Sequence, residues 1–110
     1  MFDFIQGNIV HKTPTTTTIE TNGIGYKIHI PLSTFERISN KESAKLYTKL
    51  TIRDDEIKIY GFSSLEERNL FNLLLSVNGV GSNMALTILS SSSVSQFERY
   101  VVGNDTKSLQ

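Results

Sequence analysis

The chain has 110 residues, with 11 lysines and arginines against 11 aspartates and glutamates, and it contains no cysteine. This length is enough to close a hydrophobic core in one ordinary domain or two small ones. The lack of cysteine excludes disulfide scaffolds, thiolate zinc sites and thiol nucleophiles. With zero net charge, binding to a polyanion would depend on how the charges are sorted over the surface. Apolar runs such as Leu73–Leu75 are too short to span a bilayer, and no signal segment opens the chain, so we expect a cytoplasmic protein.

The first part of the chain has the pattern of short β-strands. Apolar residues alternate with polar ones, and turn signals such as Asn22-Gly23 and Pro31 separate the runs. The predicted strands cover residues 2–10, 15–19, 25–30, 45–53 and 57–62, and one helical turn is expected over 33–38. Gly7 inside the first run predicts a bulge or a sharp bend. Five such strands suit a small closed barrel better than a two-sheet sandwich.

After residue 62 the hydrophobic period changes to that of helices. Ser64 and Glu67 fit a capping box, and we expect the apolar residues of the following helix to form a core: Leu70, Phe71, Leu74 and Leu75. A break at 78–82 separates this helix from a second one over 84–89. A further capping box at Ser95 predicts a third helix, and Asn104 could begin a fourth. The sequence therefore predicts an α+β chain, a five-stranded β-barrel followed by an incomplete helical unit.

The break between the first two helices has the pattern of a helix-hairpin-helix element. Its candidate phosphate-binding residues are Asn78, Gly79, Val80, Gly81, Ser82 and Asn83. Glycine permits backbone conformations closed to other residues and lets a phosphate approach with no Cβ in the way. Val80 would pack between the helices, and the amides of 81–83 would point outward at the positive end of the second helix, which suits a phosphate. A tight turn between two helices, without any ligand, explains the same residues.

Two nucleotide-binding motifs are excluded. The dinucleotide fingerprint would need a third glycine where Met84 stands, and a strand where the preceding segment is helical. No Gly-x-x-x-x-Gly-Lys-Ser/Thr segment exists either, so we do not expect an ATPase.

A second candidate site is the acidic tip between the last two predicted strands, Arg53-Asp54-Asp55-Glu56. Three consecutive carboxylates repel one another and stay hydrated, so an ordinary solvated turn explains them. Fixed anions would also repel phosphates and keep duplex backbones from passing through one point. No histidine or further carboxylate nearby in the sequence completes a ligand set, which argues against catalysis or metal binding here.

A third feature is a strand face on which basic and aromatic residues alternate. It comprises Lys45, Tyr47, Lys49, Thr51 and Arg53, with Lys58 and Tyr60 on the neighbouring strand. Such a face is typical of a nucleic-acid groove, but a solvated outer face has the same pattern. We expect His11 and His29 to be surface or satisfied histidines rather than catalytic groups.

The order of these features is more specific than any one of them. The segments in question are Gly23-Ile24-Gly25-Tyr26, Arg53-Asp54-Asp55, Tyr60-Gly61-Phe62, Glu67-Arg68-x-Leu70-Phe71, Asn78-Gly79-Val80-Gly81 and Ala85-x-x-Ile88-Leu89-Ser90. In this succession the chain resembles the bacterial RuvA family, the Holliday-junction-binding subunits of the RuvA–RuvB branch migration complex. The resemblance covers nearly the whole chain.

The resemblance implies an OB-fold domain over residues 1–62 and a helix-hairpin-helix domain over 63–110, truncated before its second hairpin. It implies a DNA-binding subunit, without catalysis or cofactor, that holds a four-way junction open and planar in recombination and repair. The family assembles as a homotetramer, or as an octamer of two tetramers, and the motor is a RuvB-type ATPase. Asp54 and Asp55, with Arg53 beside them, would be the acidic pin at the junction centre, and residues 78–83 the hairpin on duplex phosphates.

The sequence departs from the family pattern in two respects. Many relatives carry Pro-Lys after the hairpin glycines, where this chain has Ser82-Asn83. A serine can still cap the second helix, but a phosphate-facing cation is missing. The second hairpin and the domain that grips RuvB are also missing, so we expect a piece of a longer protein that does not couple to RuvB.

Other functions stay open from the residues alone. A generic OB-fold binder of single-stranded nucleic acid would use the Lys/Tyr strand face. A DNA-processing enzyme would need a catalytic Asp or Lys shortly after the hairpin, and Ser90–Ser93 supplies neither. A purely structural interaction module would bind no DNA in any oligomeric state.

Overall fold

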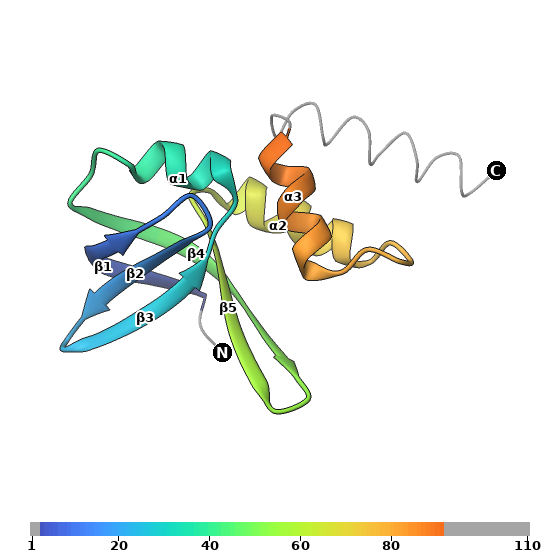
Figure 1. Ribbon diagram of the computed structural model, residues 1–110, viewed down its shortest axis with the longest axis horizontal. Coiled ribbons are helices and arrows are strands. Elements are labelled where there is room, and N and C mark those ends of the chain that lie inside the picture. Colours follow the sequence, from blue (N-terminus) through green and yellow to red (C-terminus); the bar gives the residue numbers. More distant parts are fainter. Residues whose placement is uncertain (1–2, 92–110) are drawn as a thin grey trace.

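The computed structural model describes residues 3–91 of the chain (Figure 1). Its elements are β1 (Phe4–Lys12), β2 (Thr16–Thr21), β3 (Ile24–His29), α1 (Leu32–Ile38), β4 (Ser43–Arg53), β5 (Glu56–Phe62), α2 (Leu65–Leu75) and α3 (Ser82–Ser91). These bounds confirm each predicted strand and the first two predicted helices. The helices expected from Ser95 and Asn104 lie outside the described residues.

The five strands form a closed barrel in the order β1-β2-β3-β5-β4, as predicted. All neighbours are antiparallel except β3 and β5, which are parallel. Asn22 and Gly23, between β2 and β3, have φ values of 52° and 82°, as the tight hairpin turn between antiparallel strands requires. A Cβ on Gly7 would lie 2.2 Å from the carbonyl oxygen of Glu20, so glycine is needed at this position. The register shift of β1 against β2 lies between Ile9 and His11 rather than at Gly7, where a bulge or bend was predicted.

The barrel interior is filled by apolar side chains that the strands and α1 direct inward. They are Ile5, Ile19, Ile28, Ile30, Ile38 and Leu46. All come from the strands or α1 except Ile30, which lies in the link between β3 and α1, and each has less than a tenth of its surface exposed. Complete burial of such a side chain contributes about 1.5–3 kcal/mol, so this cluster stabilises the barrel that carries the hairpin described next.

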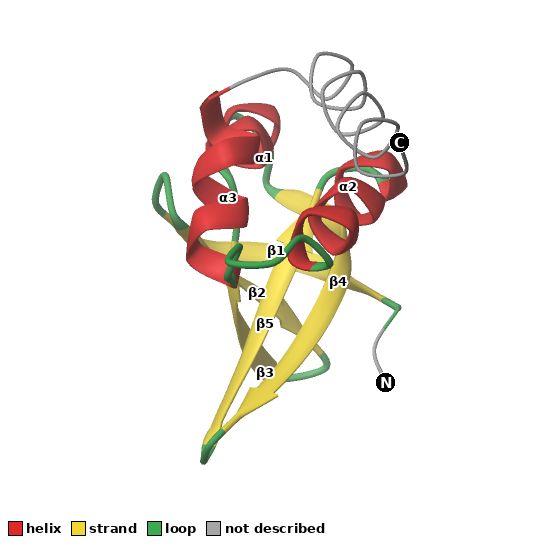
Figure 2. Cartoon of the chain, turned by 90° about the vertical axis from the view of Figure 1, so that its right-hand side faces the viewer, coloured by secondary structure: helices red, strands yellow, loops and turns green. Residues whose placement is uncertain are grey.

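The β4–β5 hairpin extends beyond the barrel. The two strands pair from Tyr47↔Phe62 to Arg53↔Glu56, and Figures 1 and 2 show the end of this hairpin projecting away from the other strands and from the helices. Near the end, Ile52 and Ile57 face each other across the pair and are 67% and 65% exposed. The acidic tip is therefore presented at the end of a two-stranded arm.

The helices pack on the outer side of β5 and form a second core. It comprises Tyr60, Phe62, Leu70, Phe71, Leu74, Ala85 and Leu89. The ring of Phe71 lies 5.2 Å from that of Tyr60 and 4.9 Å from that of Phe62, measured between centroids. Tyr60 is only 3% exposed, so its predicted place on a solvated basic and aromatic face is wrong. The outward side chains at the end of β5, Tyr60 and Phe62, are covered because α2 packs over them.

Glu67 joins α1, α2 and the end of β5. Its carboxylate is fully buried and accepts hydrogen bonds from the hydroxyls of Ser33, at 2.6 Å, and Ser63, at 2.5 Å. Ser64 Oγ accepts from the Glu67 amide at 3.2 Å, which confirms the predicted cap. The glutamate side chain, however, binds the two serine hydroxyls, which fixes the start of α2 against the barrel.

Two further contacts hold the helices on the barrel. The Ser90 hydroxyl of α3 accepts from the Leu32 amide at 2.9 Å. Arg68 Nη1 donates to Asp3 Oδ1 at 2.7 Å and to the Asp3 carbonyl at 2.9 Å. Together with Glu67, these bonds set the position of the turn between α2 and α3 relative to the β4–β5 hairpin.

Candidate nucleic-acid interface

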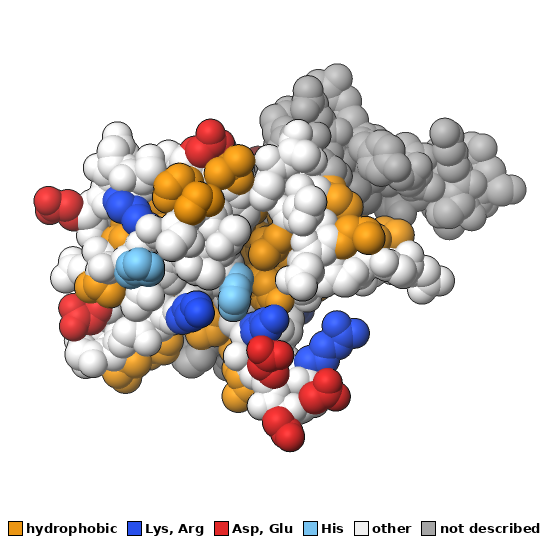
Figure 3. Space-filling model, in the orientation of Figure 1, with side chains coloured by type: hydrophobic (Ala, Val, Ile, Leu, Met, Phe, Trp, Pro, Cys, Tyr) orange, Lys and Arg blue, Asp and Glu red, His pale blue; other side chains and the backbone are white. Residues whose placement is uncertain are grey.

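The acidic tip is an exposed two-residue turn. Asp54 and Asp55 connect the paired residues Arg53 and Glu56, and all four side chains are exposed. Asp54 has φ 55°, a left-handed conformation that Asp tolerates better than most residues. Among residues 3–91 neither Asp54 nor Asp55 has an ion-pair partner, whereas Glu56 lies 3.8 Å from Lys58 Nζ. The tip therefore ends in two uncompensated carboxylates (Figure 3).

The glycine turn between α2 and α3 presents backbone amides. The Ala85 amide donates to the Gly81 carbonyl at 2.9 Å, so Gly81 is the N-cap of α3. The next three amides, of Ser82, Asn83 and Met84, have no carbonyl of their own helix to bind. The expectation that a serine caps this helix is wrong, because Ser82 is already its first residue and Gly81 has no side chain.

The side chain of Val80 anchors this turn. It is partly buried and packs against the core of α2, α3 and β5. Its amide donates to the Val77 carbonyl at 3.1 Å. Asn78, Gly79, Gly81 and Asn83 are exposed around it. The turn is therefore fixed by one apolar side chain while its polar backbone faces outward.

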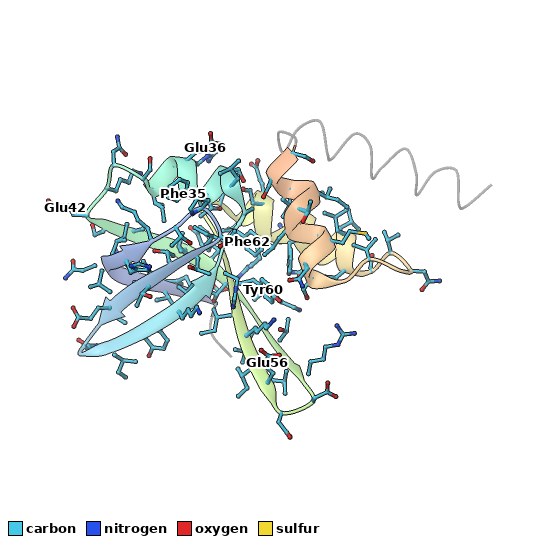
Figure 4. The ribbon with its side chains drawn as sticks, viewed as in Figure 1. Phe35, Glu36, Glu42, Glu56, Tyr60 and Phe62 are labelled. Atoms are coloured by element: carbon cyan, nitrogen blue, oxygen red, sulfur yellow. The ribbon has the colours of Figure 1, made fainter. Side chains whose placement is uncertain are left out.

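The hairpin and the glycine turn line one groove of about 470 Å³. Its lining residues are Thr51, Ile52, Arg53, Glu56, Lys58, Tyr60, Leu75, Val80, Gly81, Ser82, Asn83 and Met84. Arg53 and Val80–Asn83, all predicted from sequence, thus come together here. Asp54, Asp55, Asn78 and Gly79 do not line the groove. Figure 4 shows Glu56 towards the hairpin end and Tyr60 towards the helices.

The electrostatics of this groove suit an anion on the side of α3. The N-terminus of α3 carries a partial positive charge from its aligned peptide dipoles. The arginine and lysine that line the groove, Arg53 and Lys58, come from the two strands of the hairpin. Glu56 is its acidic residue and lies on the hairpin rather than on the turn. The groove thus offers amides and cations beside α3, with one carboxylate, Glu56, on its hairpin side.

Comparison with known proteins agrees with these features. Residues 1–61 match the family described as the RuvA N terminal domain. The chain belongs to this RuvA family. Similar curated proteins named Holliday junction branch migration complex subunit RuvA come from Flavobacterium psychrophilum (38% identity over 110 residues, 100% of this chain and 57% of that protein) and Acetivibrio thermocellus (42% over 110 residues, 99% and 54%). Another, from Bacteroides fragilis, is 46% identical over 90 residues, which are 82% of this chain and 45% of that protein. The chain spans about half the length of these relatives.

In this RuvA-family chain the basic and aromatic strand face is split by α2. In the first part of the face, Lys45 Nζ lies 4.3 Å from the ring centroid of Phe4 and 5.3 Å from that of Tyr47. The guanidinium carbon of Arg68 lies 5.9 Å from the Tyr47 centroid. In the second part of the face, Thr51, Arg53 and Lys58 line the groove beside the glycine turn. The predicted continuous face is therefore two separate surfaces.

The sequence identified Glu67 and Lys58 of this RuvA-family chain but not the roles that the structure gives them. The burial of Glu67 depends on the closed barrel, which places Ser33 beside its carboxylate, and no local sequence pattern predicts this contact. The capping-box pattern identified the residue but not the direction of its carboxylate. Lys58 was predicted on a strand face, yet it borders two grooves, one on each side of β5.

The described residues add two negative findings. Within residues 3–91 no three His, Cys, Asp or Glu side chains gather in a way that could hold a metal ion. In the same part of the chain no helix has the length and apolarity needed to cross a membrane.

Proposed function

We propose that this chain is a non-catalytic subunit that binds four-way DNA junctions and holds them open for branch migration. The observation that carries the proposal is the groove between the β4–β5 hairpin, which ends in the acidic tip, and the glycine turn. In this proposal residues 1–62 are an OB-fold domain and residues 63–110 an incomplete helix-hairpin-helix domain. The names of the relatives support the same function for the longer proteins.

The glycine turn would bind a phosphate of a duplex arm. The amides of Ser82, Asn83 and Met84 lie at the positive end of α3, where an anion is favoured by about 0.3–1 kcal/mol per charge at an exposed site. Gly81 has open space around the position that a Cβ would occupy, so a phosphate oxygen can approach the backbone there. Such contacts position the DNA but read no base, as a junction binder requires.

The acidic tip would act by repulsion. Asp54 and Asp55 lie in the turn at the end of the projecting hairpin and do not line the groove. In a four-fold assembly these tips would meet at the axis and keep the four DNA backbones apart. The glycine turns would then bind the duplex arms of the junction at positions farther from this axis. The acidic pin therefore shapes the junction, while the turn supplies affinity.

Affinity would depend on assembly. The chain has zero net charge, and one glycine turn neutralises few phosphates, whereas DNA affinity rises steeply with that number. Copies on one rigid assembly make later contacts intramolecular, which raises the effective concentration. We therefore propose a homotetramer, or an octamer, as the binding species. A RuvB-type ATPase would be the motor of the complex.

Binding of single-stranded nucleic acid is the alternative function. The exposed Phe4 ring, 45% accessible, together with Lys45 and Tyr47, forms a cation and aromatic surface on which a base could stack. This surface is small, because α2 covers the neighbouring Tyr60. Tyr47→Ala would weaken single-strand binding in this alternative and leave junction binding unchanged in the first.

A competition titration tests the proposal. A labelled four-way junction is displaced by unlabelled junction, by linear duplex of equal length and by single strand, while sedimentation gives the oligomeric state. The proposal expects the junction to compete best and binding to require an oligomer. Equal competition by linear duplex, or tight junction binding by a proven monomer, would refute it.

A further inference from the structure

A second groove lies on the opposite side of β5. Its volume is about 400 Å³, and it is lined by Lys27, His29, Glu56, Ile57, Lys58 and Ile59. It exists because the described pairing of β3 with β5 is restricted to Ile28↔Ile59 and His29↔Tyr60, and the two strands lie apart before these residues (Figure 1). Neither Lys27 nor His29 lines the groove of the glycine turn.

Two lysines line this groove, Lys27 from β3 and Lys58 from β5. Both lie close enough to His29 for their charges to act on its imidazole. Their like charges repel each other. Glu56 offsets part of this repulsion, but its carboxylate is 3.8 Å from Lys58 Nζ and 68% exposed. Two lysines against one glutamate leave a charge of +1 in the groove before His29 is counted.

His29 is held at the inner end of the same groove. Its ring lies 5.6 Å from that of Tyr60, which is itself buried against Phe71. An imidazole fixed in this way loses little conformational entropy when a ligand binds. Partial burial, and then the charges of Lys58 and Lys27, lower the pKa of His29 from 6.5, with Glu56 opposing them. The free imidazole is therefore neutral at pH 7 and carries one N–H donor.

We propose that Lys27, His29 and Lys58 form a second binding site for a backbone phosphate of DNA. The site rests on the proposed junction binding and extends it to the other side of the hairpin. Two ammonium groups and an imidazole N–H are all donors, which matches the acceptor oxygens of a phosphodiester. The glycine turn binds through uncharged amides, whereas this site binds through charge and responds to pH.

The pH response has a definite sign. A bound phosphate adds a negative charge next to His29, which raises the pKa of the imidazole above that of the free protein. Binding then takes up protons, so affinity increases as the pH falls through the pKa of the bound state and is lower at higher pH. Lys27, Lys58, Glu56 and the Tyr60 hydroxyl are the titratable groups around this imidazole on β3 and β5.

The test follows the His29 imidazole resonance by NMR between pH 5.5 and 8, with and without a four-way junction. Junction affinity is measured over a range of salt for Lys27→Gln and for Lys41→Gln, an exposed lysine that lies in neither groove. We expect the pKa of His29 to rise when DNA binds. Lys27→Gln should weaken binding and reduce the slope of log K against log salt by about 1, whereas Lys41→Gln should change neither.

The outcomes separate this site from the proposed function. A His29 pKa that does not move with DNA bound, and equal affinities of the two lysine variants, overturn the second site while junction binding stands. Failure of the wild-type chain to bind junctions overturns both. A polyglutamate peptide serves as a further probe, and a His29 shift with this peptide but not with DNA would assign the groove to an acidic protein and overturn the proposal.

Discussion

Gly79 and Gly81 stand two positions apart in the turn between α2 and α3, and the structure requires glycine at only one of them. Gly79 has φ +84°, a conformation that side chains rarely adopt. Gly81 does not have such a φ, and a Cβ there would meet no atom within 4 Å. The fold thus explains the first glycine but not the second, and the proposed phosphate contact would explain why Gly81 carries no side chain.

Replacing Gly79 tests the role of the fold. Gly79→Ala places a Cβ in the left-handed region and should destabilise the chain by about 1–2 kcal/mol. Urea unfolding followed by circular dichroism measures this change. Junction affinity, measured where the variant is still folded, should fall only modestly. Unchanged stability would show that the turn does not need this φ.

Replacing Gly81 by serine should separate stability from binding. Serine is a preferred N-cap, so Gly81→Ser should leave the free energy of unfolding unchanged or raise it by a few tenths of a kcal/mol. Its hydroxyl would bind the free amides of α3 and fill the space left for a phosphate, so junction affinity should fall. A variant that is as stable as the wild type and binds equally well would contradict the phosphate role of the turn.

Removing the acidic pin should change the shape of the bound junction more than its affinity. Asp54→Asn with Asp55→Asn removes the repulsion at the tip, and fluorescence energy transfer between labelled junction arms should report a change from the open, square geometry. The control is Glu36→Gln with Glu42→Gln, which removes the same amount of charge at exposed positions away from the tip. An equal effect of both double variants would mean that only net charge matters.

Glu67 should be important for stability although it touches no proposed ligand. Glu67→Ala leaves the hydroxyls of Ser33 and Ser63 without their acceptor in a buried site, which costs about 1–3 kcal/mol. Glu66→Ala is the matched control, because Glu66 is also in the first turn of α2 but is exposed. Thermal or urea unfolding compares the two. Equal stabilities would show that the carboxylate does not hold α2 on the barrel.

His29 should make the stability of the free chain depend on pH. Because its pKa is lowered in the folded chain, the unfolded chain binds more protons just below pH 6.5, and stability is lost as the pH falls through that range. His29→Gln should reduce the loss of stability between pH 7 and 5.5, and His11→Gln, at an exposed position, should not. Identical pH profiles for wild type and His29→Gln would refute the shift.

The barrel could be predicted from the sequence because alternation and turn residues act locally. Tyr26 and Ile28 of β3 alternate with polar residues, and Asn22-Gly23 specifies the turn before this strand, so the hairpin could be predicted. Alternation fails at the end of β5, because α2 covers Tyr60 and Phe62 on the face that the pattern assigns to solvent. A pattern of alternating polarity assumes that one face meets water.

The candidate sites could be predicted as segments but not as a groove. Residues 53–55 and 78–83 are visible from charge and glycine content alone. Their common groove depends on closure of the barrel and on the bonds of Glu67, Ser90 and Arg68 that hold the helices. These contacts join residues 34 to 65 positions apart, which no local pattern contains.

Directed cleavage of a four-way junction tests the central claim most directly. The chain has no cysteine, so a single cysteine can carry an iron chelate at one chosen place. Ile57→Cys lies next to the acidic tip and Asn78→Cys in the glycine turn, and both positions are exposed. We predict hydroxyl-radical cuts at the crossover nucleotides of all four strands from Ile57→Cys, and cuts along the arms from Asn78→Cys. The same cutting pattern from both positions, or arm cleavage from the tip, would contradict an acidic pin at the junction centre.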